Sequence, residues 1–386
     1  MSSNQSQSVI TSIKPLIIAT QLTAFTLFSI NTKTWKSEVK KFNIFVGCMS
    51  TSFSLSLHYL FWTSDLRFAT QGTEVTKNIM PMQVYSNLVI YTIVKLWNFF
   101  NTQKIVNFLR QINQIDEIFK DLGIYFDYKR DSKVIVKILI GIFALIIVST
   151  VISACLHVGY LNSEGISLSL LNFYTFSCGS MLIVQFVTAM IGIRRRYETV
   201  NNFLILKPNL KIPEIKILSK IHLMTTESIE MFNIVYGPAV ILFISLGFGW
   251  FCMFIFTLVM FPPIMWTDLL FVSLYNVLVN LMSFTTVAIL FYYGEWTKKE
   301  ARRTVKLLYK IIDDVNCEKI ERKMQKMISQ ICDMKVEFSC GLVDFNWKFF
   351  FKFVTAAIMY FVILVQFESS FGKNNSFNVT GSSYST

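Results

Sequence analysis

The chain has 386 residues, of which 53% are hydrophobic and 16% charged, and it carries 37 Phe and a formal net charge of +12. This composition has too much apolar surface for a single water-soluble domain and is typical of a protein that crosses a membrane several times. The basic residues lie beside apolar segments, where anionic lipid attracts them, so the positive charge does not indicate a nucleic-acid partner.

Seven apolar segments are long enough to cross a bilayer as helices, since about 20 residues span the hydrocarbon core. They lie at residues 42–62, 80–100, 134–160, 166–193, 234–261, 268–293 and 349–370. Lys95, Lys137 and Lys352 fall inside these windows near one end, so we expect their side chains to reach the headgroups. The sequence therefore predicts an all-α membrane protein with seven transmembrane helices.

The distribution of basic residues predicts the orientation of these helices. Of the 36 Lys and Arg, 30 fall in four segments that would share one side of the membrane: 1–41, 101–133, 194–233 and 294–348. By the positive-inside rule the amino terminus is cytoplasmic and the carboxyl terminus extracellular. A G-protein-coupled receptor has the reverse orientation, which disfavours that class.

The same topology divides the chain into five parts. They are a cytoplasmic amino-terminal segment, a six-helix bundle, a cytoplasmic helical anchor, the seventh helix and an extracellular tail, at 1–41, 42–293, 294–348, 349–370 and 371–386. Within the first part, residues 15–30 are apolar but short, which predicts a re-entrant or interfacial helix. In the tail, Asn374 and Asn378 head glycosylation sequons.

The cytoplasmic segments contain helical patterns of their own. A helix that starts near Pro213 leads into the fifth span. Residues 295–334 predict two consecutive helices, and the second has an apolar face at helical spacing, made by Ile320, Met324, Met327, Ile328 and Ile331. Lys and Arg mixed with acidic residues around this face favour packing against protein.

Other function classes find little support. The seven Cys form no CxxC pair, and the three isolated His give neither a metal site nor a catalytic constellation, so we expect no enzyme, metal or cofactor. A transporter commonly shows internal repeats or helices broken by Gly or Pro. Repeats are not evident, and the only hints of a break are Pro238 and the Pro262-Pro263 pair.

The last span carries a specific motif, in which Tyr360 is followed by five apolar residues, Gln366 and Phe367. It resembles the signature of insect gustatory receptors, although Met359 stands where that family usually has Thr. The segment 340–344, Cys-Gly-Leu-Val-Asp, precedes the span and resembles the family's cysteine-glycine-apolar-acid segment. Looser similarities extend over most of the chain, at Lys14-Pro15, Arg194 to Tyr197, Asn201, His222 and Asn233.

The resemblance implies a tastant-gated, non-selective cation channel in the plasma membrane of sensory neurons. Four subunits, identical or mixed with related receptors, would surround a pore lined by the seventh helix, and Tyr360, Gly341 and Asp344 would pack within the receptor. The ligand would be a bitter compound or a sugar. An insect odorant receptor shares this fold and topology and is the main alternative, but it usually lacks the tyrosine-to-phenylalanine ending.

Helical geometry indicates which face of the seventh helix would line such a pore. At about 100° per residue, Gln366 lies about 120° away from Tyr360 and Phe367. The pore and gate candidates are Met359, Val362, Ile363, Gln366, Phe367 and Ser370. A ring of Gln366 side chains between apolar neighbours could act as a gate that opens when water fills the constriction. Alternatively, Gln366 forms a hydrogen bond with a neighbouring helix.

A ligand pocket is expected in the outer half of the bundle between the second and sixth spans, where the resemblance places it away from the pore axis. The aromatic and hydrogen-bonding candidates there are Tyr85, Tyr91, His157, Asn172, Tyr174, Trp250, Asp268, Tyr275 and Asn276. Aromatic faces and a few polar groups suit a sugar or a planar compound. Interfacial Tyr and Trp can instead be membrane anchors.

Overall fold

The computed structural model describes residues 9–22, 29–31, 35–38, 41–63, 74–157, 163–260, 266–314, 317–341 and 343–380. These ranges are almost entirely helical, which confirms the predicted fold class. The helices are α1 (Val9–Leu22), α2 (Lys41–Thr63), α3 (Glu74–Phe100), α4 (Thr102–Asp121), α5 (Tyr128–His157), α6 (Ser163–Leu206), α7 (Ile212–Met260), α8 (Trp266–Asp313), α9 (Glu318–Asp333) and α10 (Trp347–Thr380). Two short strands, β1 (Ser29–Asn31) and β2 (Lys36–Glu38), pair antiparallel with Ile30 opposite Ser37.

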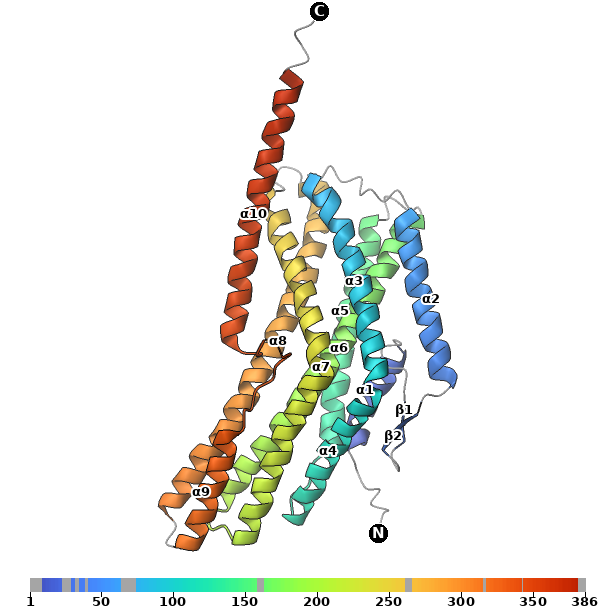
Figure 1. Cartoon of the computed structure of the whole chain (residues 1–386). Coiled ribbons are helices and arrows are strands. Elements are labelled where there is room, and N and C mark those ends of the chain that lie inside the picture. Colours follow the sequence, from blue (N-terminus) through green and yellow to red (C-terminus); the bar gives the residue numbers. More distant parts are fainter. Residues whose placement is uncertain are drawn as a thin grey trace, which may run out of the picture.

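The described part of each predicted span lies within one helix: α2, α3, α5, α6, α7, α8 or α10. These helices run up and down a single bundle, and the last turns of α10 project beyond the other helices at the top of the view (Figure 1). Among the described residues, four stretches are long and apolar enough to cross a membrane: Tyr128–Ile152, Ser177–Leu206, Ile212–Cys252 and Trp347–Phe367.

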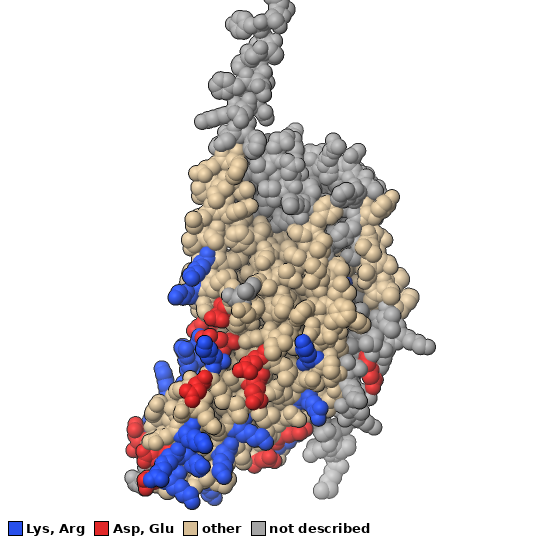
Figure 2. Space-filling model, in the orientation of Figure 1, with Lys and Arg blue, Asp and Glu red and all other residues tan. Residues whose placement is uncertain are grey.

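Three of the helices are much longer than a bilayer is thick. α6, α7 and α8 have 44, 49 and 48 residues, which at 1.5 Å per residue is roughly twice the 30 Å of a hydrocarbon core. Their extensions gather with α4 and α9 at one end of the molecule (Figure 1). Lys, Arg, Asp and Glu side chains cluster over this end on the described surface (Figure 2), and we refer to it as the charged end.

Of the two helices predicted at residues 295–334, the structure corrects the first and agrees with the second. Residues 295–313 are not a separate helix, because α8 continues without a break to Asp313. The reason is a buried stripe at helical spacing, made by Thr297, Ala301, Thr304, Leu308 and Ile311, that keeps the extension packed. In α9 the predicted apolar face is confirmed, since Met324, Met327, Ile328 and Ile331 are all buried.

The amino-terminal helix begins six residues earlier than predicted. α1 runs from Val9 to Leu22 with Pro15 inside it, and Ile30 lies in β1 instead. Val9, Ser12, Leu16 and Ala19, at helical spacing, are buried, and α1 packs against α5. Pro is favoured in the first turn of a helix, so Pro15 suggested that the helix starts there. Burial of this face explains why the helix instead begins before Pro15. In α7, by contrast, Pro213 does follow the first helical residue.

Candidate ligand site and pore helix

The last helix, α10, has two different apolar faces. One contains the buried Phe353, Ala357 and Leu364, and it packs against α7, where Phe248 meets the ring of Phe353 at 5.4 Å between centroids. The other consists of four of the predicted pore residues, Met359, Val362, Ile363 and Phe367, whose side chains are 45 to 63% exposed. A single chain therefore leaves a continuous apolar surface along its seventh predicted span.

The remaining motif residues of α10, Tyr360 and Gln366, are exposed as well. The Tyr360 ring contacts Phe248 of α7, with centroids 6.2 Å apart, while half of the side chain stays exposed. Gln366 is exposed on the chain's surface. The side chains of Ser370, Asn374 and Asn378 lie outside the part that the structure describes, although their backbone belongs to α10.

The cysteine-glycine segment forms a tight hairpin just before α10. Ser339 and Asp344 pair across it, the N–H of Cys340 donates to the Val343 carbonyl at 3.0 Å, and the N–H of Phe345 donates to the Phe338 carbonyl at 2.8 Å. Gly341 has φ of +86°, a left-handed conformation that favours glycine. The motif residues Gly341 and Asp344 thus shape the turn that leads into α10.

Two glycines let this hairpin approach the bundle closely. A Cβ atom on Gly237 of α7 would lie 2.9 Å from Cα of Cys340, and one on Gly294 of α8 would lie 2.9 Å from the carbonyl oxygen of Phe345. A salt bridge of 2.5 Å between Lys298 and Glu337 holds the preceding residues to α8. The hairpin is therefore fixed to α7 and α8 immediately before the pore candidate begins.

A polar stripe runs along one face of α3. Asn87, Tyr91 and Lys95 are four residues apart and so lie one above another on the helix. Asn87 accepts a hydrogen bond of 3.2 Å from the Trp250 indole of α7. The Tyr91 hydroxyl packs against Gly179 of α6, where a Cβ atom would come within 2.6 Å of it.

Lys95 makes its hydrogen bonds within the bundle, which contradicts the prediction that its side chain reaches the headgroups. Its ammonium group donates to Ser50 of α2 at 2.8 Å and to the Tyr174 hydroxyl of α6 at 2.5 Å, and it lies 4.5 Å from the centre of the Tyr174 ring. The physical reason is that Lys95 lies one helical turn beyond Tyr91, on the face of α3 that turns toward α2 and α6.

The structure brings several predicted ligand residues into this region. Tyr91 and Tyr174 flank the contact between α3 and α6, and Trp250 joins the same stripe through Asn87. Tyr85 is partly buried on α3. The side chains of the other candidates lie outside the described residues: His157, Asn172, Asp268, Tyr275 and Asn276. Sequence reasoning missed Asn87 and misplaced Lys95, although their spacing with Tyr91 could have revealed the stripe.

At the charged end, buried polar pairs join helices that are distant in sequence. The Asn201 amide donates to both the carbonyl and the carboxylate of Glu300 at 2.9 Å, and Thr304 donates to Asn201 at 2.7 Å. Asp116 accepts from Arg196 at 2.6 Å and from the Tyr128 hydroxyl at 2.7 Å. Burial raises the pKa of the Asp116 carboxyl, and Arg196 and Tyr128 oppose that rise.

Histidine, cysteine and acidic side chains do not gather into a metal site in the described part of the chain. The chain is rich in hydrophobic residues, its long helices are apolar, and polar side chains pack between them. Together these features define a multi-pass helical membrane protein.

Comparisons with known proteins identify the family. The family model described as 7tm Chemosensory receptor matches residues 13–371, nearly the whole chain, and the chain belongs to this family. No curated protein matches it. The fold is similar to the insect olfactory receptor OR5 from Machilis hrabei, with a TM-score of 0.74 at 10% identity over 92% of this chain and 97% of that one. The same receptor in complex with eugenol matches with a TM-score of 0.71 over the same shares of the chains, also at 10% identity.

Proposed function

We propose that this receptor is a ligand-gated, non-selective cation channel that responds to a tastant. The observation that carries the proposal is the exposed apolar face of α10 in a chain of the chemosensory receptor family. A face of this kind needs lipid or another protein to cover it. Four copies, identical or mixed with related receptors, would place these faces around a central pore.

Gln366 supplies a polar group among the apolar residues of that face. In a fourfold assembly it would form an amide ring flanked by Ile363 and Phe367, and such a constriction can gate by wetting. Ser370 would continue the same stripe. The hairpin at 338–345 would couple movements of α7 and α8 to α10, since it is packed against both helices.

The ligand site proposed here lies around Lys95, Tyr91, Tyr174 and Trp250. An ionisable group within a membrane span is by default a functional-site hypothesis, and aromatic faces with a few polar groups suit a sugar or a planar bitter compound. The eugenol complex of the related olfactory receptor supports a small organic ligand. A ligand that binds the open arrangement better than the closed one would open the channel by shifting the population.

The orientation proposed has the charged end in the cytoplasm and the carboxyl terminus outside, in the plasma membrane of sensory neurons. The concentration of Lys and Arg at one end supports it. Glycosylation at Asn374 and Asn378 would follow from the same orientation. Epitope tags at the two termini test it: the carboxyl-terminal tag should bind antibody on intact cells, and the amino-terminal tag only after permeabilisation.

An odorant-type receptor channel is the second candidate, favoured by the similarity to the olfactory receptor OR5. Whole-cell recording with panels of sugars, bitter compounds and volatile odorants separates the two. Currents evoked by sugars or bitter compounds support the tastant proposal, whereas currents evoked only by volatile odorants would replace it. The G-protein alternative predicts that currents vanish when a non-hydrolysable GDP analogue is dialysed into the cell, and the channel proposal predicts that they persist.

A further inference from the structure

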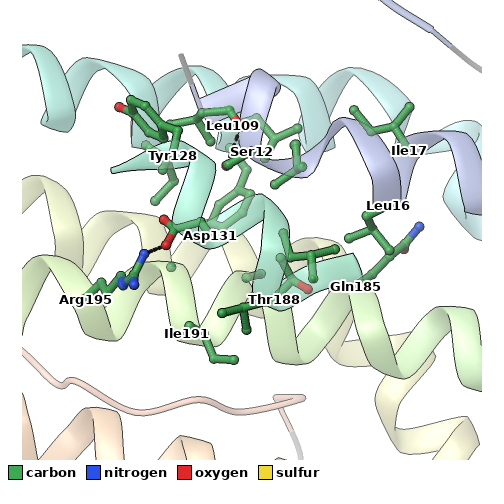
Figure 3. Close-up of a pocket in the computed structure, with 18 of the residues that line it drawn as sticks. Ser12, Leu16, Ile17, Leu109, Tyr128, Asp131, Gln185, Thr188, Ile191 and Arg195 are labelled. Atoms are coloured by element: carbon green, nitrogen blue, oxygen red, sulfur yellow. Dashed lines mark hydrogen bonds and ion pairs between the residues drawn. The ribbon is translucent and has the colours of Figure 1, made fainter. Parts of the chain in front are cut away.

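A cavity of about 150 Å³ lies between α1, α4, α5 and α6. Figure 3 shows its walls, with Leu16 and Gln185 toward one end and Tyr128 and Arg195 toward the other. None of its lining residues belongs to α10 or to the cluster around Lys95. An engineered protein cavity of about this volume binds benzene, so the space matches a single six-membered ring.

Most of the wall is aliphatic. Leu16 and Ile17 come from α1, Leu109 from α4 and Ile135 from α5, and all four line the cavity. Such a lining favours an apolar occupant over bulk water. Since α1 supplies one side, an occupant would contact the amino-terminal helix and the transmembrane bundle together.

α6 contributes a polar stripe to this apolar space. Gln185, Thr188, Gly192 and Arg195 recur at intervals of three and four residues and therefore share one face of the helix. The Oε1 atom of Gln185 and the Oγ1 atom of Thr188 are buried and have no hydrogen-bond partner. Buried polar atoms usually have one, so these two atoms leave one acceptor and one hydroxyl available to an occupant.

The charged groups at the other end of the cavity are already paired with each other. Asp131 forms an ion pair with Arg195, and the Tyr128 hydroxyl donates to Asp116, which also binds Arg196. These pairs balance their charges within the wall. The wall of the cavity therefore has no unbalanced charge that would attract an anion or a cation. The cavity suits a neutral compound.

We propose that this cavity is a second small-molecule site, for a neutral single-ring compound with one hydroxyl group. The hydroxyl donates to Oε1 of Gln185 and accepts from Thr188, while the ring fills the aliphatic space. The site is separate from the ligand site around Lys95, and an occupant holds α1 against α6.

Phenol and toluene test the proposal because they have the same shape and differ by a hydroxyl in place of a methyl group. Their dissociation constants are measured by ligand-detected NMR on the purified full-length protein in lipid nanodiscs, with empty nanodiscs as the blank. The wild type should bind phenol more tightly than toluene. Thr188→Val and Gln185→Met should each weaken phenol binding by about threefold to tenfold and leave toluene binding unchanged.

Two further variants locate the site. Ala189→Leu fills the cavity and should abolish saturable binding of both compounds. Ser245→Ala removes a hydroxyl from an exposed position on α7 and should change neither. Equal affinity of the wild type for phenol and toluene, or an unchanged phenol affinity in Thr188→Val and Ala189→Leu, would overturn the proposal. Absence of saturable phenol binding would do the same and would mean that water alone satisfies the two atoms.

Discussion

Asn233 on α7 binds the backbone on both sides of residue 338 through the two polar atoms of its side-chain amide. Its Nδ2 donates to the Glu337 carbonyl at 2.9 Å, and the N–H of Ser339 donates to its Oδ1 at 3.0 Å. More than 100 residues separate the partners in sequence. This contact joins the helix of the fifth span to the hairpin that leads into α10.

Asn233→Ala should lower the free energy of unfolding by about 1–3 kcal/mol, because it leaves a backbone carbonyl and a backbone N–H without their partner. The melting temperature of the purified receptor measures the loss. Asn113→Ala is the matched control, since that amide donates to Glu117 on an exposed helix surface, and it should stay within about 0.5 kcal/mol of the wild type. Equal melting temperatures for the two variants would show that the Asn233 contact does not hold the hairpin.

Gly237→Ala should destabilise the receptor because the added methyl group meets backbone atoms that cannot move aside freely. The new Cβ would lie 2.9 Å from Cα of Cys340, and overpacking of this kind costs about 1–3 kcal/mol. Gly141 of α5 has nothing within 4 Å of the same position, so Gly141→Ala should be neutral or slightly stabilising through its better helix propensity. Melting curves of both variants in the same lipid check the prediction. A Gly237→Ala receptor as stable as the Gly141→Ala receptor would contradict the close packing of the hairpin.

Gln366→Ala should change the conductance, rectification or ion selectivity of the channel, because it removes the polar ring of the proposed gate. Single-channel recording in excised patches measures all three. Ser245→Ala, at an exposed position on α7, is the control and should conduct like the wild type. If Gln366→Ala gives a functional channel with unaltered conduction, the role of Gln366 as a gate is wrong.

Tyr174→Phe should shift the ligand concentration for half-maximal current by about threefold to tenfold without reducing the maximal current. It removes the hydroxyl that accepts from Lys95, and one hydrogen bond contributes about 0.5–1.5 kcal/mol. Lys95→Met should act in the same direction, as should Tyr275→Ala and Asn276→Ala at two further ligand candidates that the sequence predicts. Tyr125→Phe removes an exposed hydroxyl before α5 and should leave the dose response unchanged. A set of site variants with the dose response of the wild type would refute this ligand site.

The sequence predicted those features that depend on local periodicity. Apolar windows located the helices α2, α3, α5, α6, α7, α8 and α10, and the 3.6-residue repeat identified the buried face of α9, including Met324 and Ile331. Both predictions rest on the fact that a helix displays its pattern along a continuous stretch of chain.

Features that depend on the rotation and packing of helices were not predictable from one sequence. Nothing local showed that Lys95 turns toward Ser50 and Tyr174, because these partners lie 45 and 79 residues away. The contact of Gly237 with Cys340 and the pairing of Asn201 with Glu300 also join distant segments. Helix α8 continues past residue 295 because its buried stripe packs against other helices. A short window of sequence does not show those contacts.

The most direct test of the channel account is a current recording from planar bilayers that contain only the purified receptor. Addition of an active tastant to the chamber that faces the carboxyl terminus should evoke a cation current without any G protein. The tastant is chosen beforehand as a compound that raises the melting temperature of the purified receptor. If such a compound binds the reconstituted receptor and no conductance follows, alone or with a co-expressed related receptor, the protein is not a ligand-gated channel.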